Sequence, residues 1–269
     1  MKANASVPAT DPMLSKNREI YDHSDDEIWQ RAVYEPVHDG WHFTNIGGRR
    51  ALRRIAELVD LKADMQVLDL CCGSGAALRY LKLNYGISAT GLDINPSQIA
   101  RACERTADLE GLQFVVADAT NWISENRYDL AFALDSLTLI PDMEGFFSTA
   151  RKSLNAGGLF ALTDVVEGQN LSESMRAFAS QEDGIVTLAS SQAIAEAMAQ
   201  SGFDRIEIFS DNAEAVRVFS LIFNRVHSEE GWGELPRDRV DSWKELSARY
   251  LAAFQADELG YATVIGRAA

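Results

Sequence analysis

Apolar and polar positions alternate in a regular way along residues 65–166. Short runs rich in Val, Ile, Leu and Phe, of strand length, are separated by stretches whose apolar residues recur every three or four positions, as on one face of a helix. The first run ends at Asp69, and the following runs cover residues 87–92, 114–117, 130–134 and 159–166. Strands that alternate with helices predict right-handed crossovers and a parallel sheet.

The remaining pattern extends this sheet and adds helices to it. A helix is predicted from Asp142, as its N-cap, to Leu154, and another over residues 191–200. Residues 203–209 and 261–266 have the pattern of a sixth and a seventh strand. We therefore predict an α/β fold, a Rossmann-like, doubly wound, mostly parallel seven-stranded sheet.

Amphipathic patterns over residues 18–62 and 212–258 lie outside this alternation. A connection between the last two strands of such a sheet needs only a few residues, so the second pattern is an insertion. We interpret both as helical lids over the carboxyl ends of the strands; the alternative is that they only pad the sheet. The predicted organisation is a mobile tail (1–17), an N-terminal helical lid (18–62), the core (63–211), the insertion (212–258) and the last strand of the core (259–269).

Composition narrows the function classes. With 40 acidic and 25 basic residues the net charge is −15, which disfavours nucleic-acid partners. The three cysteines show no zinc spacing, so no metal site and a reduced, cytoplasmic protein are expected. No apolar run approaches the 18 residues of a membrane span, so no membrane partner is expected. Monomer and homodimer both stay open.

The first strand ends in a glycine turn, in the order Asp69-Leu70-Cys71-Cys72-Gly73-Ser74-Gly75. A turn of this kind brings backbone N–H groups close to a nucleoside-type ligand. An NAD-binding fingerprint would need a third glycine at position 78, which is Leu. The spacing therefore disfavours an NAD-binding oxidoreductase, which is kept as an alternative.

Acidic residues also follow the next three strands: Asp93, Asp118 and Asp135. Asp93 has the position of an acid that binds ribose hydroxyls in a βαβ unit. Asn95 and Pro96 then predict a helix start, with Gln98 at the capping-box position.

This arrangement resembles the small-molecule class I S-adenosylmethionine (SAM) dependent methyltransferases, in particular phosphoethanolamine and glycine/sarcosine N-methyltransferases. The resemblance implies that Gly73 and Gly75 approach the methionine moiety and that Asp93 holds the ribose. It further implies that Ile94 and Ala119 flank the adenine, that Asp118 meets its amino group, that Tyr21 closes over the sulfonium and that Asn45 lies near the methionine carboxylate. The expected SAM-binding set is Tyr21, Asn45, Asp69, Cys71, Gly73, Gly75, Asp93, Ile94, Gln98, Asp118, Ala119 and Leu134.

Two positions depart from the family pattern. Cys71 stands where the turn usually has its first glycine. This replacement is tolerable, because small residues also serve at that position. Leu139 stands where the phosphoethanolamine enzymes carry a histidine, so that histidine's role cannot be transferred and phosphobases are disfavoured as substrates.

Asp135, His42 and Tyr21 are the candidate catalytic residues. Asp135 could orient or deprotonate an acceptor, or instead bind a lid backbone; His42 could be a base or a structural lid residue. The sequence thus predicts methyl transfer to nitrogen or oxygen, with carbon not excluded, of a small metabolite, of which aromatic and heterocyclic compounds are examples. A non-catalytic SAM-binding protein is the second alternative.

Overall fold

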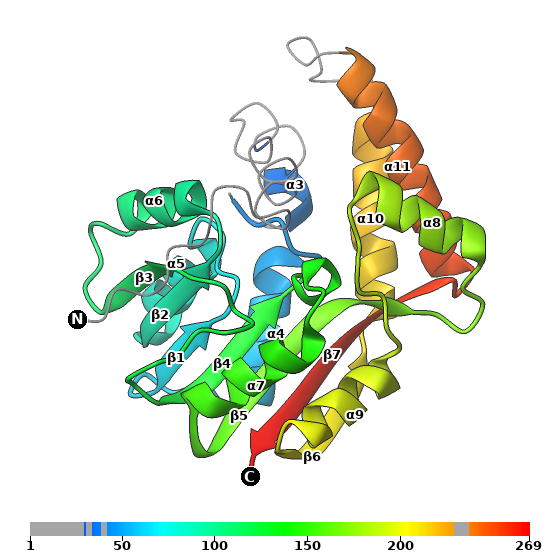
Figure 1. Cartoon of the computed structure of the whole chain (residues 1–269). Coiled ribbons are helices and arrows are strands. Elements are labelled where there is room, and N and C mark those ends of the chain that lie inside the picture. Colours follow the sequence, from blue (N-terminus) through cyan, green and yellow to red (C-terminus); the bar gives the residue numbers. More distant parts are fainter. Residues whose placement is uncertain (1–29, 31–33, 39–41, 229–236) are drawn as a thin grey trace.

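The computed structural model describes residues 30, 34–38, 42–228 and 237–269. They contain a seven-stranded sheet in the order β3-β2-β1-β4-β5-β7-β6 (Figure 1). The strands are β1 (Gln66–Asp69), β2 (Ser88–Asp93), β3 (Leu112–Val116), β4 (Tyr128–Leu134), β5 (Leu154–Glu167), β6 (Phe203–Ser210) and β7 (Leu259–Ala268). Neighbouring strands from β3 to β5 are parallel, whereas β7 runs antiparallel to both β5 and β6. The predicted fold class is confirmed.

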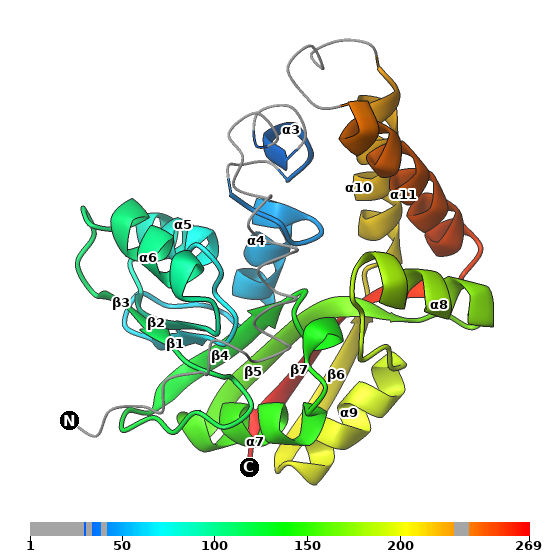
Figure 2. The same cartoon turned by 45° about the horizontal axis from the view of Figure 1, so that its top comes forward.

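Helices cover both faces of the sheet (Figures 1 and 2). Successive strand residues point to opposite faces, so Leu130 and Phe132 of β4 join one apolar cluster and Ala131 and Ala133 the other. The helices that the structure describes are α3 (Glu35–His38), α4 (Gly48–Leu58), α5 (Ala76–Tyr85), α6 (Pro96–Arg105), α7 (Met143–Ser153), α8 (Glu173–Glu182), α9 (Ser191–Gln200), α10 (Asn212–His227) and α11 (Arg237–Gln255).

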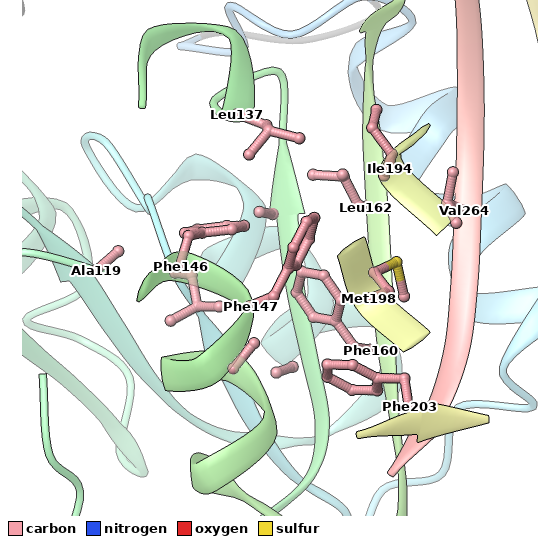
Figure 3. Packing of buried hydrophobic residues seen from close by; sticks show 14 of the residues in the cluster. Ala119, Leu137, Phe146, Phe147, Phe160, Leu162, Ile194, Met198, Phe203 and Val264 are labelled. Carbon is pink, nitrogen blue, oxygen red and sulfur yellow. The ribbon is translucent and has the colours of Figure 1, made fainter. Parts of the chain in front are cut away.

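The larger cluster lies between the sheet and helices α7 and α9 (Figure 3). Phe146 and Phe147 of α7 pack edge-on against Phe160 of β5, with ring centroids 6.1 and 6.0 Å apart, and Phe203 lies 5.6 Å from Phe160. All four rings are buried. Aromatic pairs at these distances add to the stability that burial provides. This rigid layer holds β4 and β5, whose carboxyl ends carry Asp135 and Asp164.

A second apolar cluster, on the other face of the sheet, includes residues of α4. Its buried Leu52 and Ile55 pack with Val67, Leu130 and Ile265 of the sheet. Residues 48–58, which we assigned to the N-terminal lid, therefore cover the sheet face instead, as the padding alternative had it.

The insertion forms the helices α10 and α11, which pack side by side and extend beyond the sheet next to α8 (Figures 1 and 2). Val218 and Ile222 of α10 pack with Tyr250 and Phe254 of α11 and with Met175 of α8. The two helices thus have an apolar core of their own. Whether they close over a ligand stays a prediction.

Most predicted boundaries lie within a few residues of the observed ones. Asp142, Asn95 and Ser190 cap α7, α6 and α9 through side-chain oxygens. Helix α8 was not predicted, and β5 begins at Leu154 because residues 155–158 continue it across a register shift. In the described part of the chain, no helix is long and apolar enough to cross a membrane.

Candidate functional site

A cavity of about 320 Å³ lies at the carboxyl ends of the parallel strands. This is where ligands bind in open α/β sheets. Of the residues predicted from sequence, the structure places twelve on its wall: His42, Asn45, Asp69, Cys71, Gly73, Asp93, Ile94, Gln98, Asp118, Ala119, Leu134 and Asp135. Gly75 lies behind the wall, and Tyr21 lies outside the described residues.

The two glycines of the turn after β1 have different surroundings. Both have a left-handed backbone, with φ of 50° at Gly73 and 79° at Gly75. A Cβ on Gly73 would meet only Gln98 Oε1, at 4.0 Å, whereas one on Gly75 would lie 3.0 Å from Ala102 and 3.2 Å from Phe114. Gly73 therefore leaves bare backbone at the cavity, and Gly75 allows α5 to approach α6 and β3.

Asp93, at the end of β2, holds that turn in place. Its Oδ2 accepts a hydrogen bond from Gly73 N and its Oδ1 from Asn95 N, both 2.9 Å long. Burial raises the pKa of Asp93 to about 6, while these two donors oppose the shift. The carboxylate keeps lone pairs for hydroxyl donors, as a ribose site requires.

Asp118, after β3, is bound more fully. Thr120 donates to its Oδ1 through both the backbone N, at 2.8 Å, and the hydroxyl, at 2.7 Å, and Asn121 Nδ2 donates to its Oδ2. These contacts fix the loop between Asp118 and Asn121. The contact of Asp118 with adenine stays a prediction, as do the contacts of Ile94 and Ala119.

Asp69, at the end of β1, is 2% exposed and has one long backbone donor, Cys71 N at 3.5 Å. Burial raises the pKa of Asp69 to about 8, and the nearby Asp93 adds to the shift. Burial likewise raises the pKa of the Cys71 and Cys72 thiols, which keeps both protonated near neutral pH.

The raised pKa of Asp69 has a consequence for stability. Between its ordinary value of 3.8 and about 8, the folded protein keeps a proton that the unfolded chain has released, so stability falls as pH rises through that window. We expect Asp69→Asn to raise the Tm of the ligand-free protein at pH 7.5 by about 2–6 °C, equivalent to about 1–2 kcal/mol, and to change it little at pH 4.5.

Differential scanning fluorimetry across pH 4.5–8 tests this expectation. Asp64→Asn, at an exposed position, is the control and should follow the parent protein. Equal effects of Asp69→Asn at both ends of the pH range would contradict it.

Asp135 connects three parts of the chain. Its Oδ2 accepts from Ile46 N at 2.5 Å, and its Oδ1 accepts from the Tyr261 hydroxyl at 2.7 Å and from Thr163 Oγ1 at 3.4 Å. Burial, and then the charge of Asp164, raises the pKa of Asp135 to about 8, against the effect of these donors. The alternative that Asp135 binds the backbone of the N-terminal segment is therefore observed; a catalytic role stays a prediction.

The N-terminal segment contributes His42 and Asn45 to the cavity. His42 N donates to Gln30 Oε1 at 2.7 Å, and Asn45 Nδ2 donates to Ile46 O at 3.2 Å. His42 has φ of 66° and Asp135 has φ of 48°. Left-handed backbone at non-glycine residues is costly and concentrates at functional sites. These two candidates are thus held in strained conformations at the cavity wall.

Leu139, at the position of the family's histidine, lies on one wall of the cavity. Sequence reasoning missed the rest of this wall, which is formed by Ile140, Pro141, Gly184 and Val186. The backbone N atoms of Val186 and Thr187 donate to Thr138 O at 2.9 and 3.0 Å, which joins the segment after α8 to the segment after β4. No local motif marks these residues, because the wall exists only when the two segments meet.

Asp164, near the carboxyl end of β5, was also not assigned a role. Its Oδ2 accepts from Leu137 N at 2.7 Å and from Thr138 N at 3.3 Å, the first residues of the 3₁₀ turn η2 (Leu137–Leu139). Burial raises its pKa to about 6, although backbone donors oppose the shift.

A second cavity, of about 360 Å³, adjoins Tyr261 and Thr163 on the side of α4. Arg50 pairs with Glu214 at 3.1 Å and Arg54 with Asp211 at 2.8 Å, so these two arginines are balanced by acids at the start of α10. Thr263 Oγ1 also donates to Asp211. These pairs hold α4 against α10, so we assign these charged residues of the second cavity a structural role.

Comparison with known proteins agrees with this geometry. A model of the methyltransferase domain family matches residues 41–208, and the chain belongs to that family. It is 31% identical over 133 residues to phosphoethanolamine N-methyltransferase 3 of Arabidopsis thaliana, covering 49% of this chain and 27% of that protein. It is 30% identical over 128 residues to the sterol 24-C-methyltransferase ERG6B of Gibberella zeae, covering 44% and 34%.

The fold has the same relatives. Phosphoethanolamine N-methyltransferase 2 of Haemonchus contortus, solved with phosphomonomethylethanolamine and S-adenosylhomocysteine, superposes with a TM-score of 0.82 at 21% identity, covering 97% of this chain and 61% of that one. The matches span about a third or less of the two curated relatives. The predicted methyltransferase family and the class I fold are confirmed, and the NAD-binding alternative is not supported.

Proposed function

We propose that this chain binds SAM in the cavity at the carboxyl ends of the strands and transfers its methyl group to nitrogen or oxygen of a small metabolite. The observation that carries this proposal is the open backbone at Gly73, tied by its N–H to Asp93 at the cavity wall. We also propose a cytoplasmic protein, monomeric or homodimeric, without nucleic-acid partners.

The residues present fit the cofactor. Gly73 offers backbone where a Cβ would fill the space, Asp93 offers acceptors for the ribose hydroxyls, and the carboxylates of the wall favour a cationic sulfonium. When bound, SAM supplies a methyl group activated by positive sulfur. The protein then has to hold the acceptor in line and exclude water, an alignment effect worth at most roughly 7–11 kcal/mol.

The printed activities of the relatives do not transfer unchanged. The Arabidopsis relative is a phosphoethanolamine N-methyltransferase and the Gibberella relative a sterol C-methyltransferase. In this chain the cavity wall carries Leu139 where we expect the histidine of the phosphoethanolamine enzymes. We therefore propose an acceptor outside the phosphobases.

Two measurements test the proposal. Titration calorimetry should detect binding of SAM and of S-adenosylhomocysteine to the folded protein, and no heat from either would reject the cofactor site. Incubation with methyl-labelled SAM and a small-metabolite extract should then yield labelled product. Binding without any transfer would instead support the alternative of a non-catalytic SAM-binding protein.

A further inference from the structure

The order of the strands separates the cavity into two halves. Asp118, Asp93 and Gly73 follow β3, β2 and β1, which lie side by side at one end of the sheet. If the proposed function holds, on which this inference rests, the cofactor occupies that half. The other half, beyond β1, is bounded by Asp135 after β4, by residues 139–141 and by residues 184–186. We identify this second half as the acceptor site.

The titratable side chains at the wall are mainly acidic, and no Lys or Arg balances them among the described residues. Its acidic side chains, in that part of the chain, are Asp69, Asp93, Asp118 and Asp135. Asp164 lies behind Asp135 and acts on it electrostatically. Besides burial, the charge of Asp164 already raises the pKa of Asp135, because a second negative charge in this buried place is unfavourable. An anionic acceptor would add such a charge at a place of low dielectric constant, where repulsion is strong.

The backbone donors at the acceptor site are already engaged. Leu137 N and Thr138 N, which begin η2 and would otherwise suit an anion, donate to Asp164. Ile46 N donates to Asp135, and Val186 N donates to Thr138 O. A phosphate or carboxylate needs such N–H groups or a guanidinium to replace its hydration. These donors therefore cannot serve it without breaking a hydrogen bond of the protein.

Apart from Ser136, whose hydroxyl donates to Leu134 O, the rest of the described wall at residues 139–141 and 186 carries apolar side chains. The wall here includes Leu139, Ile140, Pro141 and Val186. Val186 is 60% exposed and lies on the segment held to Thr138. Covering exposed aliphatic carbon with an apolar ligand removes it from water, which stabilises the complex. Asp135, an acidic residue of the described cavity wall at this end, would meet the ligand's polar group.

We propose that the methyl acceptor is an amine on an apolar body, without phosphate or carboxylate groups, and that Asp135 binds its nitrogen. The nitrogen lone pair forms the new N–C bond while the methyl–sulfur bond breaks and leaves its electron pair on sulfur. The positive charge passes to nitrogen, beside the Asp135 carboxylate, and the N–H proton leaves to that carboxylate or to water.

Calorimetry on the protein saturated with S-adenosylhomocysteine tests the acceptor class without turnover. The probes are 2-phenylethylamine and hexylamine, each with the alcohol and the carboxylate on the same carbon body, and phosphoethanolamine. We expect at least one amine to bind more tightly than its alcohol, by about tenfold, and its carboxylate and phosphoethanolamine to bind more weakly still. Binding of neither amine, or tighter binding of an anion, overturns the inference.

Variants locate the effect. Asp135→Asn should remove the preference for the amine over the alcohol. Val186→Lys should weaken binding of the amine and strengthen binding of the carboxylate, each by about threefold or more, relative to Val186→Thr as the uncharged control. An unchanged amine preference in Asp135→Asn, with S-adenosylhomocysteine still bound, also overturns the inference. Failure of S-adenosylhomocysteine to bind the parent protein rejects the proposed function instead.

Discussion

Replacing Asp93 by Ala is expected to weaken binding of S-adenosylhomocysteine by about a hundredfold, or about 3 kcal/mol. The substitution removes the proposed acceptor for both ribose hydroxyls. It also releases Gly73 N and Asn95 N, each of which donates to Asp93 at 2.9 Å. The turn after β1 thereby loses the contact that holds its backbone at the cavity wall. Titration calorimetry gives the affinity directly.

Asp118→Ala is the matched control for this result. It also removes an acid that lines the cavity, but its oxygens are occupied by Thr120 and Asn121, so we expect a loss of about tenfold or less. A melting curve of Asp93→Ala shows whether the fold survives. Unchanged affinity in a folded Asp93→Ala variant would remove Asp93 from the ribose site.

The two turn glycines are expected to fail in different ways when each is replaced by Ala. A Cβ on Gly75 would lie 3.0 Å from Ala102 in addition to the left-handed backbone, so Gly75→Ala should cost about 2–4 kcal/mol of stability. Gly73→Ala pays the backbone cost alone, roughly 1–2 kcal/mol, because its Cβ would enter open space. That space is the proposed methionine site, so Gly73→Ala should lose cofactor affinity by about tenfold or more.

Melting curves and calorimetry on the two variants separate these effects. We expect a Tm decrease of about 5–10 °C for Gly75→Ala and less than half of that for Gly73→Ala. Each glycine serves as the control for the other, because their φ values have the same sign. A Gly73→Ala protein that binds S-adenosylhomocysteine normally would contradict the proposed placement of the cofactor.

Several residues of the cavity wall could be predicted because their position depends only on a strand end. Asp69, Asp93 and Asp118 each follow a short apolar run, and the carboxyl ends of parallel strands meet at one edge of the sheet. Their convergence on one cavity therefore follows from the strand pattern alone. The same holds for Gly73, since a turn directly after the first strand has to face that edge.

Asp135 shows where this kind of reasoning stops. Its position after β4 was predictable, but its partners Ile46 and Tyr261 lie far from it in sequence, and only the fold brings them together, with the Tyr261 hydroxyl also donating to Ile46 O. The carboxylate therefore carries structural hydrogen bonds whose number no sequence pattern reveals. The same applies to Asp164, which engages the donors of η2.

The sequence by itself determined the sheet, the strand that precedes the glycine turn and the row of acids, because each depends on periodicity or on neighbours along the chain. Only the tertiary structure decided that α4 covers the sheet and that residues 139–141 and 184–186 form an apolar wall. That wall arises from hydrogen bonds between two segments remote in sequence, at Thr138 O. Contacts of this kind form only when the packed core brings the segments together, so the chemistry of the acceptor site was hidden until then.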